Sequence, residues 1–485
     1  MEKKLEDELQ QLRLMVDAGA AEDALEKLRK LRERPAFPAE ELWQLDELAG
    51  ACYSMLCDME RAAGCYWQAS THDKYLRSQM GHYSSYLFCL HYLSDISAQE
   101  MKQAHFFYDR LFADIRRYEH PQGGYGQKKK LRIGYLSTDF HDHAMADFIR
   151  PLLSLRDTSR YEAFCYAMQD TSDAVTQECR GLADGWRDLS GKSFADAAQS
   201  VFEDGVDILF DLSGHTHGGC TLITAAYKPA PVQISGIGWF DTTGLSAMDY
   251  FLTDTYFEDR QENFCERLLA LSKTHMCYMP QQHSLPSYGR RTAGAAFGCF
   301  NNFAKITDEM LVLWLAIVRS VPGASLRLQD TSAMPTRCTA LRARALRLGW
   351  REDELVLSGG SPDYLQALAQ IDIALDPYPY PGGGMTCAAL YMGVPVVTMA
   401  GNRHGARQGV SLLSNAGLSA LIAENPAEYK KIALSLAKDT ERCMNLHRTL
   451  PQLVQASRLT DGHAYMRELE LAYEHIWENW LNSQT

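Results

Sequence analysis

The segment from residue 371 to residue 413 constrains the fold of this chain more than any other stretch. An apolar run that ends at Leu375 leads into a proline- and glycine-rich turn, 377–384. A helix-forming run, 385–392, and a second apolar run, 394–399, follow the turn. This order of strand, glycine-rich turn, helix and strand is typical of a βαβ unit. We therefore expect a parallel sheet here, with a ligand at the carboxyl ends of its strands.

Three consecutive glycines, Gly382–Gly384, lie in that turn. Without Cβ atoms, their backbone N–H groups can approach a ligand closely. The helix that follows directs the positive end of its dipole to the same place, which suits a phosphate. The alternative is a flexible connection between two strands. A second loop with donor groups, 401–407, follows the next strand and favours an anionic ligand.

The composition indicates a cytoplasmic protein with reduced thiols. The net charge of −13 argues against a nucleic-acid backbone or an anionic membrane surface as the main partner. The first ten residues lack the apolar core of a signal peptide. No apolar run approaches the roughly 20 residues that span a bilayer. The 13 cysteines are scattered and include no CxxC pair, so we expect neither disulfides nor a zinc site made by cysteines.

The hydrophobic period divides the chain into three parts. Residues 1–125 repeat apolar side chains at helical spacing, as at Leu5, Leu9 and Leu12, and predict an all-helical domain. Small residues ahead of aromatic ones around 62–67 resemble a tetratricopeptide (TPR) unit, although a plain helical bundle is the alternative. No catalytic group stands out in this part. We expect a protein-interaction surface here, with homo-oligomerisation as a further use.

Two regions in which strands alternate with helices follow. We place a first Rossmann-like domain at 131–283 and a second one at 293–485, which includes a C-terminal amphipathic helix over 462–482. Linker composition separates the parts at 120–130 and 284–295. The predicted fold class is therefore α/β, with two Rossmann-like domains preceded by an all-α, TPR-like domain.

Two polar clusters follow strands of the first Rossmann-like domain. The first, 138–143, contains His143, and the second, 211–217, contains His215 and His217. Histidines and carboxylates at the ends of neighbouring strands are suited to acid–base chemistry. Polar surface loops are the alternative, and we rank His217 below His215. The histidine spacings match no usual zinc-ligand pattern, so no metal site is predicted.

A third cluster, 301–305, follows the first strand of the second Rossmann-like domain. Asn302 can contact a base or a sugar hydroxyl, and Lys305 carries a point charge suited to a diphosphate. A solvated lysine at the start of a helix is the alternative. The chain contains no Asp-x-Asp pair, which argues against a metal-bridged diphosphate. Lys305 and N–H groups at a helix end would then neutralise a leaving diphosphate.

At these residues the chain resembles the O-GlcNAc transferase family, which includes plant SPINDLY-type and bacterial members. The resemblance runs from Leu131 to the C-terminus and rests on motifs in family order: LRIGYLSTDFHDH, ILFDLSGHT, KPAPVQISGIGWFDTTGL, MDYFLTD, FGCFNNFAKIT, LDPYPYPGGGMT and ALYMGVPVVTMAG. It implies a GT-B fold with two Rossmann domains. It also implies inverting, metal-independent transfer of a sugar from a nucleotide donor to a protein side chain, most often Ser or Thr.

The resemblance also implies roles for single residues. His143 matches the family histidine next to donor and acceptor, and Lys305 matches the lysine that neutralises the diphosphate. His215 and the loop 236–244 match segments that line the acceptor side. The positions that match donor contacts are Asn302, Lys305, Tyr364, Gly382, Gly383, Gly384, Met385 and Thr386.

Two positions depart from the family pattern. Many members have a histidine or an aromatic residue at the position of Asp147. Ala388 stands where the family usually has an Asp or Glu that holds the ribose hydroxyls. Loss of a charged acceptor predicts weaker donor binding, by about 1.5–3 kcal/mol.

We therefore expect a protein O-glycosyltransferase that takes a nucleotide sugar, UDP-GlcNAc first, as co-substrate and needs no further cofactor. The alternatives are UDP-glucose or GDP-fucose as the donor, Asn as the acceptor residue, or a catalytically weakened scaffold. A flagellin, an adhesin or another surface protein would fit as the polypeptide acceptor.

Overall fold

A computed structural model describes residues 2–35, 37–73, 75–120, 130–257, 260–281 and 294–483. The chain forms two compact units. Unit 1 consists of Met1–Ile96, Ser284–Leu413 and Leu418–Leu453, and unit 2 consists of Ser97–His283, Ser414–Gly417 and Val454–Thr485. The two predicted linkers lie largely outside the described residues, which exclude 121–129 and 282–293.

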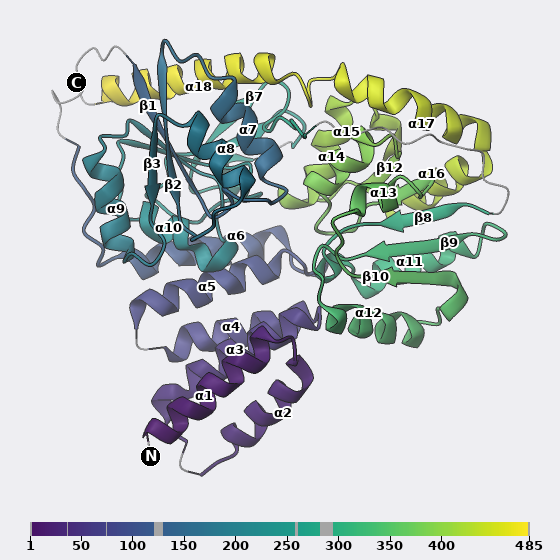
Figure 1. The fold of residues 1–485 in the computed structure, drawn as a ribbon, viewed down its shortest axis with the longest axis horizontal. Helices are drawn as coiled ribbons and strands as arrows, with labels where there is room; N and C mark the ends of the chain where they lie inside the picture. The colour runs from purple at the N-terminus through teal and green to yellow at the C-terminus, as the bar shows by residue number, and fades with distance from the viewer. Residues whose placement is uncertain are drawn as a thin grey trace. The chain divides into compact units, whose positions relative to one another are not determined.

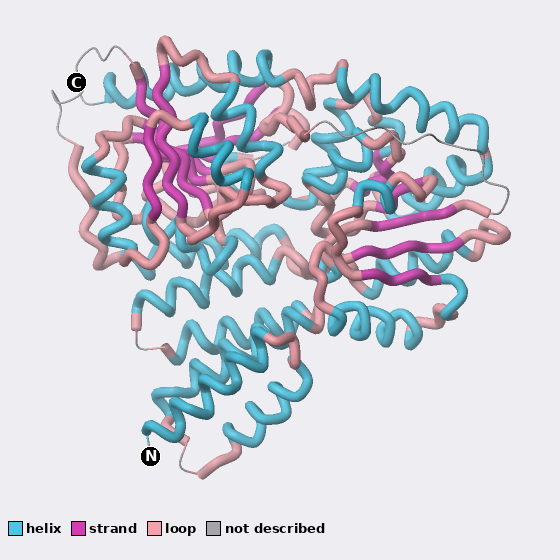
Figure 2. Tube along the Cα trace, viewed as in Figure 1, coloured by secondary structure: helices cyan, strands magenta, loops and turns pink. Residues whose placement is uncertain are grey.

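The N-terminal part of unit 1 is a stack of helices in which each helix packs on the next (Figure 2). Leucines at helical spacing, such as Leu12, Leu28 and Leu48, form its core because their stripes meet between neighbouring helices. The helices are α1 (Glu2–Asp17), α2 (Ala21–Arg32), α3 (Leu42–Met55), α4 (Met59–His72) and α5 (Leu76–Leu90).

Unit 1 also contains a six-stranded parallel sheet with the order β10-β9-β8-β11-β12-β13. Its strands β8, β9 and β10 lie side by side in Figure 1. Its strands are β8 (Ala296–Cys299), β9 (Ser325–Gln329), β10 (Leu355–Ser358), β11 (Ile373–Leu375), β12 (Val396–Met399) and β13 (Ile422–Ala423). The associated helices are α11 (Asp308–Val318), α12 (Pro335–Arg347), α13 (Tyr364–Leu368), α14 (Gly384–Tyr391), α15 (Gln408–Asn415), α16 (Pro426–Lys438) and α17 (Thr440–Gln455).

Unit 2 is built on a seven-stranded parallel sheet with the order β3-β2-β1-β4-β5-β6-β7. Its strands are β1 (Leu131–Ser137), β2 (Tyr161–Ala167), β3 (Gly185–Asp188), β4 (Ile208–Asp211), β5 (Val232–Ser235), β6 (Tyr250–Asp254) and β7 (Arg267–Leu271). The helices are α6 (Ala98–Tyr108), α7 (Ala146–Ser154), α8 (Ala174–Leu182), α9 (Phe194–Glu203), α10 (Cys220–Ala225) and α18 (Gly462–Ser483).

Two helices contact parts of unit 2 that are remote from them in sequence. The C-terminal helix α18, yellow in Figure 1, contacts β5, β7 and α7, and its Tyr473 lies against Tyr161 and Phe210. Helix α6 approaches the loop after β5 so closely that a Cβ atom at Gly244 would lie 2.0 Å from the carbonyl oxygen of His105. The sequence assigned α18 to the second Rossmann-like domain and α6 to the helical domain, whereas both pack in unit 2.

The alternation of strand and helix predicted from the sequence is present in both sheets. The βαβ unit predicted over 371–399 is β11, α14 and β12. No helix among the described residues is both long and apolar enough to cross a membrane.

Candidate active site

The order of the strands places the two predicted loops of each unit side by side. In both sheets the first strand of the sequence pairs with the fourth, β1 with β4 and β8 with β11, so the chain winds outward in opposite directions from each pair. Ligands of open parallel sheets bind at such a switch point, beyond the carboxyl ends of the strands. Lys305 follows β8 and the glycine turn follows β11. Likewise, the two histidine clusters follow β1 and β4.

Lys305 lies at the predicted glycine turn of unit 1. Its Nζ donates to the carbonyl oxygen of Pro381 at 3.1 Å and lies 3.7 Å from the centroid of the Tyr380 ring. Burial lowers the pKa of Lys305 to about 8, and the nearby carboxylate of Asp376 opposes this effect. The side chain is half-buried, and a partly desolvated ammonium group is suited to an anionic ligand, because binding a diphosphate would compensate its desolvation.

Asp376 organises the turn and was not selected from the sequence. It directly follows β11 and its side chain is buried. The carboxylate accepts the N–H of Gly382 at 2.7 Å and the hydroxyl of Thr398 at 2.8 Å. Burial raises its pKa to about 6. An aspartate at a strand end looks like many others in a sequence, so only the tertiary contacts reveal this role.

The glycine turn leads directly into α14. A Cβ atom at Gly382 would lie 2.6 Å from Oγ1 of Thr386, whereas one at Gly383 would meet nothing within 4 Å. Gly383, Gly384 and Met385 are half-buried, and Thr386 is buried. The first backbone hydrogen bond of α14 runs from the N–H of Cys387 to the carbonyl of Gly383. The N–H groups of Gly384, Met385 and Thr386 therefore precede the helical hydrogen-bond ladder and suit an anion.

Two predicted donor contacts, Asn302 and Tyr364, lie in other elements than the glycine turn. Asn302 caps the 3₁₀ turn η5 (Phe303–Lys305): its Oδ1 accepts the N–H of Ala304 at 2.9 Å and a hydrogen bond from Arg337. The preceding Asn301 is closer to the turn, because its Oδ1 would lie 3.1 Å from a Cβ atom at Gly382. Tyr364 opens α13, beyond the edge strand β10, and is half-buried. Their roles in donor binding stay predictions.

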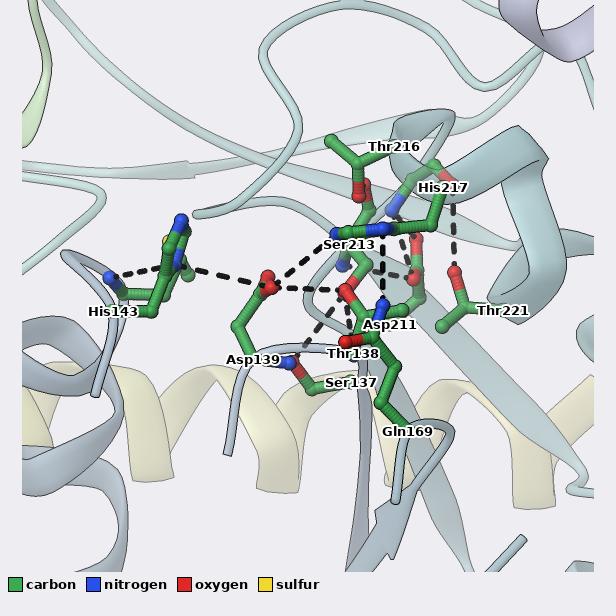
Figure 3. A network of polar contacts seen from close by, with 12 residues as sticks. Ser137, Thr138, Asp139, His143, Gln169, Asp211, Ser213, Thr216, His217 and Thr221 are labelled. Atoms are coloured by element: carbon green, nitrogen blue, oxygen red, sulfur yellow. Dashed lines mark hydrogen bonds and ion pairs between the residues drawn. The ribbon is translucent and has the colours of Figure 1, made fainter. Parts of the chain in front are cut away.

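In unit 2, two histidines flank one carboxylate (Figure 3). Nδ1 of His143 lies 3.9 Å and Nε2 of His217 lies 3.8 Å from Oδ1 of Asp139. The backbone N–H of Met145 donates to Nδ1 of His143 at 3.3 Å, and Nε2 of Gln169 donates to Nδ1 of His217 at 3.0 Å. Because Nδ1 accepts in both residues, the neutral form of each ring has its proton on Nε2. Burial lowers the pKa of His217, while Asp139 opposes this shift.

Hydroxyl groups hold this pair of loops together (Figure 3). Oγ of Ser213, after β4, accepts the N–H of Thr138, after β1, at 3.0 Å. The buried Asp211 accepts the N–H groups of Ser213 at 3.1 Å and Gly214 at 3.0 Å. The backbone that carries the histidines is thus fixed by buried polar contacts.

His215 has a different environment from the one expected. Its ring is fully buried and lies 4.8 Å from Tyr108 and 4.9 Å from Trp239, centroid to centroid. Its Nε2 donates to the carbonyl of Thr243 at 2.9 Å. Burial holds its pKa well below the ordinary value. His215 therefore joins the loop after β5 to the loop after β4, and His217, ranked lower from the sequence, is the half-exposed histidine beside Asp139.

The sequence profile of the family described as Glycosyl transferase family 41 matches residues 82–284 and 281–469. This chain belongs to that family. Curated relatives are named Probable UDP-N-acetylglucosamine–peptide N-acetylglucosaminyltransferase SPINDLY. The protein of Arabidopsis thaliana is 36% identical over 373 residues, which are 74% of this chain and 40% of that protein. The protein of Oryza sativa subsp. japonica is 35% identical over 414 residues, which are 81% of this chain and 44% of that protein.

A solved structure of a mutant Thermobaculum terrenum O-GlcNAc transferase aligns with this chain with a TM-score of 0.88 and 30% identity. The alignment covers 98% of this chain and 91% of the Thermobaculum chain. The predicted membership in the O-GlcNAc transferase-like family 41 is confirmed. The predicted fold class, a TPR-like helical region with a GT-B fold, is confirmed as well. The chain spans less than half the length of the SPINDLY relatives it matches.

Within the described residues, no group of three or more His, Cys, Asp or Glu side chains could hold a metal ion. His143 and His217 offer ring nitrogens as proton donors and acceptors, and the residues around Lys305 offer a cation and backbone amides.

Proposed function

We propose that this family 41 member is a protein O-glycosyltransferase that transfers GlcNAc from UDP-GlcNAc to Ser or Thr of a polypeptide. The names of its relatives support the donor and the peptide acceptor. The proposal includes a cytoplasmic location and a surface protein, such as a flagellin or an adhesin, as the acceptor.

The observation that carries this proposal is the half-buried Lys305, whose ammonium group lies at the glycine turn. In the proposed step the acceptor hydroxyl oxygen attacks the anomeric carbon and the bond from that carbon to the diphosphate oxygen breaks. UDP leaves, and the hydroxyl proton passes to a phosphate oxygen of the donor or to water. Lys305 and the first N–H groups of α14 would stabilise the charge that develops on the diphosphate. We propose that they make the reaction metal-independent and that a single displacement inverts the anomeric centre.

On the acceptor side, the proposal gives His143 a positioning role. Its Nδ1 accepts the N–H of Met145, so its Nε2–H is the group available to a hydroxyl oxygen or to the donor sugar. His217 is held by Gln169 and shares Asp139 with His143. We do not assign catalysis to His215, because its ring is enclosed and its Nε2–H is bound to a backbone carbonyl.

Replacement of Lys305 tests the proposal. Wild type and Lys305→Met are incubated with isotopically labelled UDP-GlcNAc, UDP-glucose or GDP-fucose and a cell lysate, and modified proteins are identified by mass spectrometry. We expect modification from UDP-GlcNAc with wild type and a loss of at least about 100-fold with Lys305→Met, as for removal of a transition-state donor. Lys431→Met, at an exposed position of α16, is the matched control.

If wild type transfers sugar from UDP-glucose or GDP-fucose and not from UDP-GlcNAc, that donor takes the place of UDP-GlcNAc in the proposal. Retained turnover by folded Lys305→Met would remove Lys305 from the mechanism.

A further inference from the structure

The ring of Tyr380 forms the platform on which Lys305 rests. At 3.7 Å from the ring centroid, Nζ is within the range of a cation–π interaction, and both side chains are half-buried. The quadrupole of an aromatic ring stabilises a desolvated ammonium group more than an exposed one. The position and orientation of Tyr380 therefore affect both where the charge of Lys305 lies and how readily Lys305 holds its proton.

Aromatic residues of the N-terminal helical stack support this platform. Tyr92, just after α5, packs edge-to-face on Tyr380 with centroids 5.1 Å apart, and Phe88 of α5 does so at 6.4 Å. Phe88 and Tyr92 also contact each other edge-to-face at 5.4 Å. These three rings form one cluster, although almost 300 residues separate Tyr92 from Tyr380. Edge-to-face contacts restrict the tilt of a ring, so Tyr92 and Phe88 restrict the platform.

A second contact joins the same segment to the other donor-side loop. Arg403, in the loop after β12, donates from its guanidinium to the carbonyl of Leu93 at 3.0 Å. Moreover, residues 92–95 line a cavity of about 550 Å³ whose wall also includes Ala304 and Ile306, the two neighbours of Lys305. The segment 88–93 thus contacts the loops after β11 and β12 and borders the loop after β8.

We propose that Tyr92, supported by Phe88, is a positioning residue for the diphosphate site, and that it acts through Tyr380 on Lys305. The end of α5 is then part of the donor-binding machinery, and the helical stack is not only a surface for polypeptides. The part of this inference that concerns donor binding rests on the proposed function. Its physical core, the control of Lys305 by the aromatic cluster, is measurable without any substrate.

The first experiment measures the titration of Lys305 directly. Protein labelled with ¹³C at lysine Cε is titrated by NMR, and the spectrum of Lys305→Met assigns the resonance. We expect Tyr380→Leu to lower the pKa of Lys305 by about one pH unit, because the ring no longer stabilises the ammonium. Tyr92→Leu should lower the pKa in the same direction by a smaller amount, and Tyr92→Phe should titrate as wild type.

The second experiment measures UDP and uridine binding by calorimetry between pH 6 and pH 9. Wild type should bind UDP more weakly as the pH rises through the pKa of Lys305, and uridine, which lacks the diphosphate, should show no such dependence. In Tyr92→Leu the midpoint for UDP should move to lower pH, with about 3- to 10-fold weaker binding at pH 8. Leu48→Ala, which weakens the helical core away from Tyr380, controls for general destabilisation and should keep the wild-type midpoint.

Phe88→Leu, a milder change, gives a second reading if Tyr92→Leu does not fold. A wild-type titration of Lys305 in every folded variant of Tyr92 and Phe88 would overturn the inference. The inference would also be overturned if Leu48→Ala shifted the pH midpoint of UDP binding as much as Tyr92→Leu does. Equal affinity of wild type for UDP and uridine would instead remove the proposed function, and the NMR titration would still decide the inference.

Discussion

The amide of Gly382 donates a hydrogen bond to the carboxylate of Asp376 at 2.7 Å. This contact closes the turn between β11 and α14 and fixes the direction from which the helix begins. Because the same carboxylate also accepts the hydroxyl of Thr398 on β12, the turn is tied to two neighbouring strands. The glycine turn is therefore a fixed structure, in contrast to the flexible loop that its composition alone would allow.

Substitution of Gly382 should show that UDP binding depends on the conformation of the glycine turn. Gly382→Ala places a Cβ atom 2.6 Å from Oγ1 of Thr386 and 3.1 Å from Oδ1 of Asp376, so the turn must shift. We expect at least about 10-fold weaker UDP binding, since the amides of α14 move with it. Gly181→Ala in α8, also with nothing within 4 Å of the added atom, is the control outside the turn and should bind UDP within about 2-fold of wild type. Equal losses in both variants, measured by calorimetry, would contradict this account.

Asp376 should make the stability of the protein fall as the pH rises from about 4 to about 6. Its pKa is about 6 in the fold and 3.8 in the ordinary state, so within this window the folded state binds more protons than the unfolded state. Asp376→Asn removes this titration. The stability of the variant relative to wild type should increase by about 2–3 kcal/mol between pH 4 and pH 6.5, measured by urea unfolding. Parallel pH profiles for the two proteins would refute the assignment.

Ala388→Asp should tighten binding of the donor. The side chain of Ala388 is 2% exposed in α14, and the family resemblance of the sequence predicts a carboxylate at this position. A carboxylate there can accept ribose hydroxyls, and we expect about 10- to 100-fold tighter UDP-sugar binding by calorimetry. The unliganded variant should unfold more easily, by about 1–3 kcal/mol, because the new charge is buried. Ala388→Asn, which lacks the charge, is the control. Unchanged donor affinity in a folded Ala388→Asp protein would speak against this placement of the ribose.

His215 should destabilise the fold in acid. Its folded-state pKa is well below 6.5, so between that pKa and about 6.5 the unfolded state binds more protons and the stability falls as the pH decreases. His215→Phe keeps the ring contacts and removes the titration. At pH 7.5 the variant should be about 1–3 kcal/mol less stable than wild type, because the carbonyl of Thr243 loses its donor. Between pH 6.5 and pH 5 the stability of the variant should fall less than that of wild type. Equal acid sensitivity of the two proteins in thermal unfolding would exclude His215 as its source.

The sequence alone determined the local elements and the loops that carry the chemistry. Leu375, the glycine turn and the apolar run after it predicted β11, α14 and β12, because hydrophobic period and turn chemistry act over a few residues. The family motifs identified Lys305 and the turn as donor-side candidates, and the structure brings them into contact.

Only the tertiary structure decided which side chains are enclosed and which remain accessible. His215 and His217 are two residues apart on one loop, yet one is buried against Tyr108 and Trp239 and the other lies beside Asp139. Contacts between segments remote in sequence likewise determine the roles of Asp376 and Tyr92 and the packing of α18 on the sheet of unit 2. Burial and desolvation depend on everything that surrounds a group, and a sequence pattern records only its neighbours along the chain.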